Sequence, residues 1–361
     1  MDLAKPLLLV LISWLPVVSF AQGLQPGFNK AEYIELIKAY SRWGDSVFYK
    51  GIDASTRYNR VYRSPVVGLD NSWELYRSAD NMAVISIRGT TKNNTSWLAN
   101  FYAAMVPAKG VLNLSDSFAF NYELAKDPKA AVHVGWLIAT AFLTTDMLPR
   151  IDSCYRAGVR DYIILGHSQG GAIAYLLTSH LYHLVQTGRL PQDIRFKTYC
   201  SAAPKPGNLY YAYEFEHQTA GGWSFNVVNA ADWVPETPVS IQSVTDFNTI
   251  NPFLNTKKLI SKQSFVKRVF FKHLYGQLTK HTARAQRRYE KYLGRMTSKY
   301  VKKQYPQFKE PEYFHSNNYV RVGNTVVLMP DSAYYQLYPN DEKRVFTHHA
   351  LQAYLWLAGR M

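Results

Sequence analysis

Apolar positions along the chain alternate between short continuous runs and longer stretches with helical spacing. The runs 82–87 and 162–165 are apolar at nearly every position, as in strands buried on both faces of a parallel sheet. Further strands are predicted at 73–76, 196–200 and 225–229, and amphipathic helices at 30–43, 134–154 and from 171 to about 185. This order predicts an α/β fold, with a mainly parallel central sheet and helices on both faces.

An aromatic stripe follows the run 82–87. A short helix starting at Thr95 or Ser96 would carry on one face Trp97, Leu98, Phe101, Tyr102 and Met105. Such a helix is either plain core or a lid whose apolar face covers a site in water and turns outward on lipid. The sequence leaves both interpretations open.

Two connecting regions have weaker patterns. The stretch 107–129 lacks a clear period, so we expect an irregular surface segment. Near the end of the chain, two apolar runs at 319–322 and 325–328 flank Gly323-Asn324, which predicts a β-hairpin.

Basic charge is concentrated in one segment. The net charge is +15, yet residues 253–303 alone hold fifteen Lys and Arg against Glu290. Apolar residues in this segment have helical spacing and predict two amphipathic basic helices with a break near Lys280. We define the basic insert as residues 253–310. We expect it to form a cap that contacts an anionic membrane or lipid surface, with no nucleic-acid partner; the alternative is a solvated cap whose apolar stripe packs on the core.

The amino terminus has the pattern of an export signal. Lys5 precedes an apolar run from Leu7 to Phe20, and small residues around Ala21 suit a signal peptidase. We therefore expect residues 1–21 to be a signal peptide, with an uncleaved anchor as the alternative. Residues 22–361 would form one exported domain, secreted or periplasmic, interrupted by the basic insert.

Two cysteines occur, and no histidine pair has metal-ligand spacing. Cys154 should end a helix and Cys200 should lie along a strand, toward opposite ends of the sheet, so we expect two free buried thiols rather than a disulfide. We expect neither a metal nor a cofactor.

The pentapeptide Gly166-His167-Ser168-Gln169-Gly170 lies between a buried strand and a helix. Glycines at its ends let strand and helix pass closely, and the sharp corner exposes the Ser168 hydroxyl above the sheet. Ser168 is therefore a candidate nucleophile. The alternative is a tight turn with an incidental serine.

Three other segments carry candidate chemistry, two at strand ends and one before the last helix. Gly89-Thr90 follows one central strand and can aim a backbone N–H into the crevice where parallel sheets bind ligands. Asp232 lies one turn beyond another strand, and His349 precedes the last helix. The order Ser168, Asp232, His349 is that of α/β-hydrolases.

These residues extend to a more specific resemblance. The chain resembles the class 3 lipases, the family of fungal triacylglycerol lipases and plant phospholipase A1-like enzymes, over roughly 28–356 without the insert. The matching segments are Ile87–Thr90, Val132–Trp136, Gly166–Gly170, Ala203–Asn208, Asn229–Pro235 and His349–Leu355. Lys205-Pro206 departs from the family's Arg-Val, and the basic insert has no counterpart there that we know.

The resemblance implies an α/β-hydrolase fold and a role for each site residue. Ser168 would be the nucleophile, His349 the base and Asp232 its orienting partner. The backbone N–H groups of Thr90 and Gln169, with the Thr90 hydroxyl, would form the oxyanion hole. It also implies structural roles for His133, near the oxyanion loop, and His167, in the packing of the elbow.

Two classes of function follow. The first is an exported serine hydrolase of lipid carboxylic esters, either a triacylglycerol lipase or a phospholipase A1-like enzyme. The second is a non-catalytic protein that keeps the fold and binds anionic membrane or polyanion through its basic helices. A weaker third is a hydrolase of peptides or polysaccharide-linked esters. The intact set of Ser168, Asp232, His349 and Thr90 favours catalysis.

Overall fold

The computed structural model describes residues 23–43, 50–253 and 255–361. The predicted signal peptide, residues 1–21, therefore lies outside the described residues. Among the described residues, no helix is both long and apolar enough to cross a bilayer.

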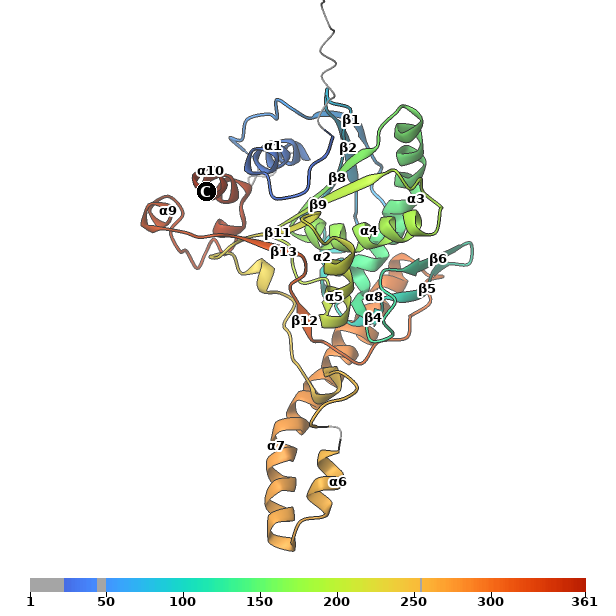
Figure 1. The fold of residues 1–361 in the computed structure, drawn as a ribbon, viewed down its shortest axis with the longest axis vertical. Coiled ribbons are helices and arrows are strands. Elements are labelled where there is room, and N and C mark those ends of the chain that lie inside the picture. The colour runs from blue at the N-terminus through green and yellow to red at the C-terminus, as the bar shows by residue number, and fades with distance from the viewer. Residues whose placement is uncertain (1–22, 44–49, 254) are drawn as a thin grey trace, which may run out of the picture.

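A seven-stranded sheet forms the centre of the molecule (Figure 1). Its spatial order is β1-β2-β3-β8-β9-β11-β13; the first two strands pair antiparallel, and all pairs from β3 to β13 are parallel. The strands are β1 (Asn59–Arg63), β2 (Trp73–Arg77), β3 (Ala83–Ile87), β8 (Asp161–His167), β9 (Arg195–Ser201), β11 (Ser224–Asn229) and β13 (Asn324–Leu328). The predicted central strands are thus confirmed, and every residue of β3, β8 and β11 is buried.

Helices cover both faces of this sheet, as expected for an α/β fold (Figure 1). Along β8, Tyr162 and Ile164 join the apolar core on one face, whereas Ile163 and Leu165 join the core on the other. The first face is covered by α3 (Val134–Arg156), α4 (Gln169–Gln186) and α5 (Leu209–Gln218), the second by α1 (Lys30–Tyr40) and α10 (Leu351–Arg360). Two-sided burial explains why these strands are almost uniformly apolar.

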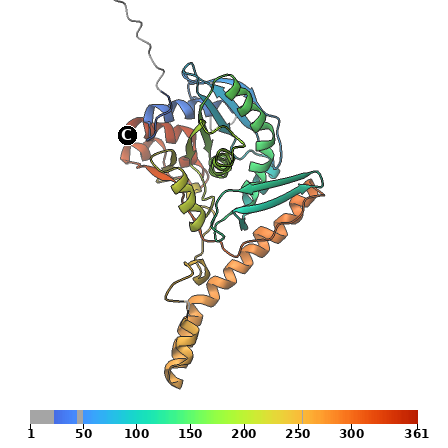
Figure 2. The ribbon, with the colours of Figure 1, turned by 45° about the vertical axis from the view of Figure 1, so that its right-hand side comes forward.

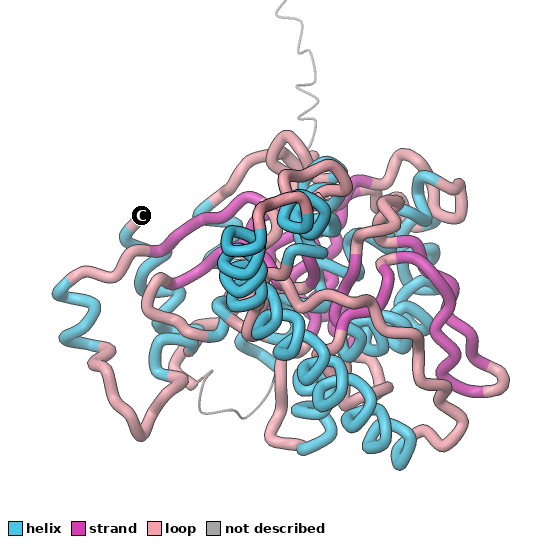
Figure 3. The backbone as a smooth tube through the Cα atoms, turned by 90° about the horizontal axis from the view of Figure 1, so that it is seen from below, coloured by secondary structure: helices cyan, strands magenta, loops and turns pink. Residues whose placement is uncertain are grey.

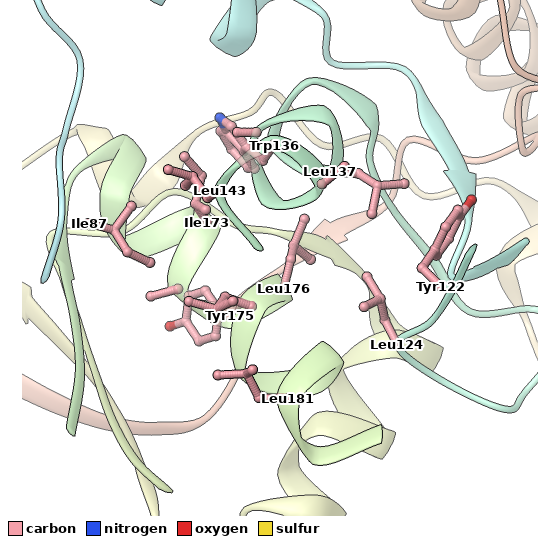
Figure 4. Close-up of a cluster of buried hydrophobic side chains, with 14 of the residues drawn as sticks. Ile87, Tyr122, Leu124, Trp136, Leu137, Leu143, Ile173, Tyr175, Leu176 and Leu181 are labelled. Carbon is pink, nitrogen blue, oxygen red and sulfur yellow. The ribbon is translucent and has the colours of Figure 1, made fainter. Parts of the chain in front are cut away.

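The larger core lies between β3, α3 and α4. Figure 4 shows Ile87, Leu137, Ile173 and Leu176 pointing toward one another from these three elements. Their side chains are fully buried. This packing holds β3 and the start of α4 in a fixed relation.

The prediction of an irregular surface segment at 107–129 is wrong. This stretch forms a hairpin of β5 (Lys109–Ser115) and β6 (Phe118–Glu123), and Leu112, Leu114 and Phe120 join the main core. In a two-stranded ribbon, buried and exposed residues alternate over only a few positions. The sequence pattern of these two strands is therefore hard to distinguish from that of a polar loop.

The predicted hairpin near the carboxyl end is also wrong. Of its two runs, β12 (Tyr319–Val320) pairs with β10 (Gly207–Asn208), and β13 pairs parallel with β11 in the main sheet. The second sheet has the order β12-β10-β7-β4, where β7 is Ala131–His133 and β4 is Met105–Pro107. The chain around Gly323, which has a φ of +83°, therefore passes from one sheet to another. A turn signal sets the local bend but not the partner of each strand.

The basic insert consists of α6 (Thr256–Ser261), α7 (Phe265–Glu290), a π-helical stretch Lys291–Met296 and α8 (Thr297–Gln304). The predicted break near Lys280 is absent, because α7 continues through it. The apolar stripe changes phase there because the helix passes from solvent onto the body. Figures 1 and 2 show α6 and the first half of α7 projecting from the molecule, and Figure 3 shows α7 running beneath it.

The two halves of the insert differ in their contacts. Val301 of α8 lies in the main core, and the backbone N–H of Ala104 donates to the Leu293 carbonyl at 3.1 Å. By contrast, no residue of α6 is buried. Only the carboxyl-terminal half of the insert is thus packed into the domain.

Both cysteines are free and buried, Cys154 at the end of α3 and Cys200 in β9. This agrees with the expected pair of free thiols. Burial raises the pKa of the Cys200 thiol well above its ordinary value, so this thiol stays protonated at neutral pH.

Candidate active site

Ser168 occupies a strained corner between β8 and α4. Its φ is +61°, a left-handed conformation that a residue with a side chain rarely adopts. The flanking glycines allow the close approach: a Cβ on Gly166 would lie 2.1 Å from backbone atoms of Gly170, and one on Gly170 would lie 2.2 Å from the Ile87 carbonyl oxygen. The corner exposes the Ser168 hydroxyl in a cavity above the sheet.

Gln169 is the first residue of α4, so its backbone N–H has no acceptor inside the helix. Its side chain is buried and donates to the Ser96 carbonyl of α2 (Asn94–Phe101) at 3.0 Å. The free N–H and the positive end of the helix dipole therefore lie beside Ser168. This is an environment suited to negative charge on an oxygen.

The loop after β3 is tied to the elbow by a tyrosine. The backbone N–H of Gly89 donates to the Tyr40 hydroxyl at 2.8 Å, and that hydroxyl donates to the His167 carbonyl at 3.3 Å. Tyr40 lies at the end of α1, on the other face of the sheet. The position of Gly89-Thr90 relative to Ser168 is thus set by a buried side chain from outside both segments.

Asn100 fixes the orientation of the Thr90 side chain. Its Nδ2 donates to Thr90 Oγ1 at 2.9 Å, its Oδ1 accepts from the Trp136 indole at 3.1 Å, and its carbonyl lies 3.2 Å from His133 Nε2. His133 is fully buried and stacked on Trp136, and burial lowers its pKa to about 3. His133 is therefore neutral and reaches Thr90 only through Asn100, in line with the structural role inferred for it.

Asp232 and His349 meet behind the cavity. His349 Nδ1 donates to Asp232 Oδ2 at 2.7 Å, and the same oxygen accepts from the Tyr354 hydroxyl at 2.8 Å. The other oxygen accepts from the Val234 backbone N–H at 3.0 Å. Burial alone would raise the pKa of Asp232, but the His349 charge and these donors hold it below its ordinary value. The carboxylate is ionised and oriented toward the imidazole.

His348 points elsewhere. Its Nδ1 lies 2.8 Å from the Tyr334 hydroxyl and its Nε2 lies 2.9 Å from Asn340 Oδ1. Of the two adjacent histidines, only His349 thus contacts Asp232 and lines the cavity that contains Ser168.

His167 is part of the elbow's packing. Its Nδ1 lies 3.0 Å from Ser201 Oγ, its Nε2 lies 2.9 Å from the His349 carbonyl oxygen, and its ring is 4.9 Å from the His349 ring. Burial, and secondarily the nearby His349, lower the pKa of His167 to about 3. A neutral His167 donates to the His349 backbone and so helps to position that loop.

The cavity itself has a volume of about 820 Å³, within the size range of small-molecule sites. Its wall includes Thr90, Ser168, Gln169 and His349, together with aromatic and aliphatic side chains. The Ser168 hydroxyl and the His349 imidazole face this space without a direct hydrogen bond among the described residues. Catalytic hydrogen bonds are often long before substrate binds. The site suits an ester with an apolar chain.

The aromatic stripe of α2 is only partly core. Trp97 and Phe101 line the cavity and are 36% and 56% exposed, whereas Tyr102 is buried and Met105 lies in β4. The helix starts at Asn94, one residue before the predicted start, and ends at Phe101. Its exposed aromatic face at the mouth of the cavity excludes the plain-core interpretation for those two residues.

Three contributors were not singled out as functional from the sequence. Asn100 and Tyr40 act on the oxyanion loop through contacts between different elements, and no local pattern reveals them. Asn100 lies 10 residues from Thr90, and Tyr40 lies 49 residues from Gly89. Tyr354 was noted only as part of the segment after His349, although its spacing of five residues would bring it one turn and a half along a helix. In the described chain, no cluster of His, Cys, Asp or Glu has the makings of a metal site.

Comparisons with known proteins match one family model and several solved structures. Residues 84–241 match the family model "Lipase (class 3)". Solved structures similar to this chain include the Rhizomucor miehei lipase propeptide complex, with 19% identity, coverage of 58% of this chain and 62% of that one, and a TM-score of 0.40. Lipase II from Rhizopus niveus has 22% identity, coverage of 58% and 73%, and a TM-score of 0.40. Lip2 lipase from Yarrowia lipolytica has 15% identity, coverage of 60% and 77%, and a TM-score of 0.42. A comparison with curated proteins finds no match.

Proposed function

We propose that the chain is a member of the class 3 lipase family, whose model matches residues 84–241, and that it is an exported serine hydrolase of lipid carboxylic esters. The observation that carries the proposal is the His349–Asp232 contact of 2.7 Å beside an apolar cavity that also receives Ser168. A buried ionised carboxylate on an imidazole serves general-base catalysis. A binding protein without catalysis has no use for that pair.

The proposed reaction proceeds in two stages. Ser168 Oγ attacks the ester carbonyl while His349 Nε2 takes its proton, and the oxyanion is stabilised by the backbone N–H groups of Thr90 and Gln169. His349 then protonates the leaving alcohol, which leaves an acyl-enzyme on Ser168. Water, deprotonated by His349, attacks the acyl carbonyl, and the released acid restores Ser168. Asp232 holds the imidazole tautomer and stabilises its protonated form.

Substitution of the nucleophile tests this function. Ser168→Ala should abolish hydrolysis of p-nitrophenyl esters of graded chain length, because the remaining groups supply only a small part of the rate. An unchanged thermal unfolding curve would show that the fold persists. Retention of more than about a tenth of the parent rate would remove Ser168 from its role.

Export and membrane contact complete the proposal. The apolar run in residues 1–21 supports cleavage after Ala21 and export of the mature chain.

Residues 256–274 of the basic insert, which we call the tip, support contact with an anionic surface. The tip has six basic residues and no acidic one.

Apolar side chains of the tip are open to solvent, which argues against the solvated-cap alternative for this half of the insert. Seven of them are 40% to 77% exposed: Leu259, Phe265, Val266, Val269, Phe270, Phe271 and Leu274. Exposed apolar side chains together with Lys and Arg are typical of helices that lie in the headgroup region of a bilayer. Each basic residue near such a surface adds about 1 kcal/mol.

A vesicle sedimentation assay tests this contact. Mature protein with Ser168→Ala should sediment with anionic vesicles, ignore neutral ones, and dissociate as salt is raised from about 0.05 to about 0.5 M. Lys262→Gln with Lys267→Gln should weaken binding by roughly tenfold or more. As a matched control, Lys299→Gln with Lys302→Gln removes the same charge from α8 and should bind as the parent does. Equal binding to both lipids, or none to either, would refute the membrane contact.

A further inference from the structure

A second pocket adjoins the catalytic cavity. It has a volume of about 460 Å³ and lies on α7 and the π-helical stretch after it. Tyr289 and Leu293 line both spaces, so the two lie next to each other. The second pocket is also lined by His281, Arg284 and Arg288. A substrate bound at Ser168 therefore has a cationic pocket next to it.

The two arginines have no partner in the described structure. Neither the Arg284 nor the Arg288 guanidinium forms a hydrogen bond or an ion pair there, although most arginines in the body of the domain do. The one carboxylate between 253 and 303, that of Glu290, is taken by Arg295 and His315, each at 2.7 Å. Both residues are exposed, so their guanidinium donors are open to solvent and available to a ligand in the pocket.

Guanidinium groups bind phosphate oxygens through paired, charge-assisted hydrogen bonds. In a glycerophospholipid, only the glycerol carbons separate the phosphate from the ester groups. An anion site for such a substrate must therefore lie next to the catalytic cavity, as this pocket does.

We infer that the pocket formed by His281, Arg284 and Arg288 binds the phosphate of the substrate lipid, so that the enzyme prefers phosphate-bearing glycerolipids to neutral ones. This inference rests on the proposed function and specifies its substrate. It assigns this part of α7 a role separate from that of the tip, which contacts the surrounding surface rather than the molecule being hydrolysed.

Monomeric substrates show the effect of the substrate's own phosphate, because no neighbouring lipid molecules are present. Dihexanoylphosphatidylglycerol and dihexanoylglycerol, used below their critical micelle concentrations, have the same acyl chains and no bilayer around them. The parent should hydrolyse the phospholipid with a kcat/KM at least about tenfold higher than that of the neutral lipid. Arg284→Gln with Arg288→Gln should reduce this preference at least tenfold, mainly by raising KM for the phospholipid.

Two further variants sharpen the test. Arg284→Lys with Arg288→Lys keeps the charge but loses the forked donors, and should keep an intermediate preference. Lys299→Gln with Lys302→Gln removes two charges elsewhere in the insert and should keep the full preference.

Each contrary result has a distinct meaning. A parent that hydrolyses p-nitrophenyl butyrate but shows no phosphate preference overturns this inference alone. A phosphate preference that survives in the Arg284→Gln, Arg288→Gln variant also overturns this inference. If that variant loses only vesicle binding, the arginines contact neighbouring lipids and not the substrate. A parent without Ser168-dependent hydrolysis of p-nitrophenyl butyrate overturns the proposed function, and this inference with it.

Discussion

Tyr354→Phe removes a single oxygen atom from behind the catalytic histidine. Tyr354 is fully buried in α10, and its hydroxyl donates to Asp232 Oδ2 at 2.8 Å, the same oxygen that accepts from His349. Phenylalanine keeps the ring and its packing. The variant therefore isolates one hydrogen bond to a buried carboxylate.

The size of the effect follows from that burial. A hydrogen bond to a charged group contributes about 1.5–3 kcal/mol, and Asp232 is buried away from bulk solvent. We expect the free energy of unfolding to fall by about 2 kcal/mol. The pKa of Asp232 should rise, because one of the donors that hold it down is gone. A less firmly held imidazole should lower kcat/KM by about tenfold, which corresponds to about 1.4 kcal/mol of transition-state stabilisation.

Tyr334→Phe is the matched control. Tyr334 is also buried, and its hydroxyl lies 2.8 Å from His348 Nδ1 and accepts from Asn229 Nδ2 at 2.8 Å. Its loss should destabilise the fold by a similar amount but leave kcat/KM within about twofold of the parent. Urea denaturation and initial rates on p-nitrophenyl butyrate measure the two quantities. Suppose that both variants lose the same free energy of unfolding but Tyr334→Phe loses more kcat/KM than Tyr354→Phe. This result would refute the assignment of Tyr354 and Asp232 to the catalytic histidine.

Three further predictions concern the neighbouring residues. His349→Ala should lose at least about a thousandfold in kcat, and His348→Ala should lose little, because only His349 contacts the ionised carboxylate; the reverse result in a p-nitrophenyl ester assay would exchange their roles. Burial lowers the pKa of His133 and of His167 from 6.5 to about 3, so the unfolded chain binds more protons than the folded one between these values. The free energy of unfolding should therefore fall by roughly 2 kcal/mol per histidine as the pH drops from about 7 to about 5, and His167→Asn should reduce that slope in urea titrations at several pH values; an equal slope would show that His167 does not remain neutral. Gly166→Ala should destabilise the protein by about 3 kcal/mol or more, because its Cβ would lie 2.1 Å from the Gly170 backbone; a melting temperature equal to the parent's would mean that β8 and α4 can separate.

Three segments differ from their sequence-based prediction because a local pattern can have two tertiary solutions. Gly323 marks a bend correctly, but β12 and β13 then pair in different sheets, since pairing is decided by which edges are available. The hairpin of β5 and β6 escaped notice because its buried residues alternate with exposed ones over only a few positions. In α7 the stripe shifts phase at Lys280 while the backbone remains helical, because a change of environment alters which face must be apolar.

The order of the central strands and helices, and the position of the strained corner at Ser168, are predictable from the chain alone. These follow from local causes: runs that must be buried on both faces, and glycines where a Cβ has no room. Which groups meet depends on packing between distant segments, which brings Tyr40 and Asn100 to the oxyanion loop, Tyr354 to Asp232, and two unpaired arginines to the side of the cavity. Such contacts join segments up to 122 residues apart. They depend on how helices pack across the sheet, and no single stretch of the chain contains that information.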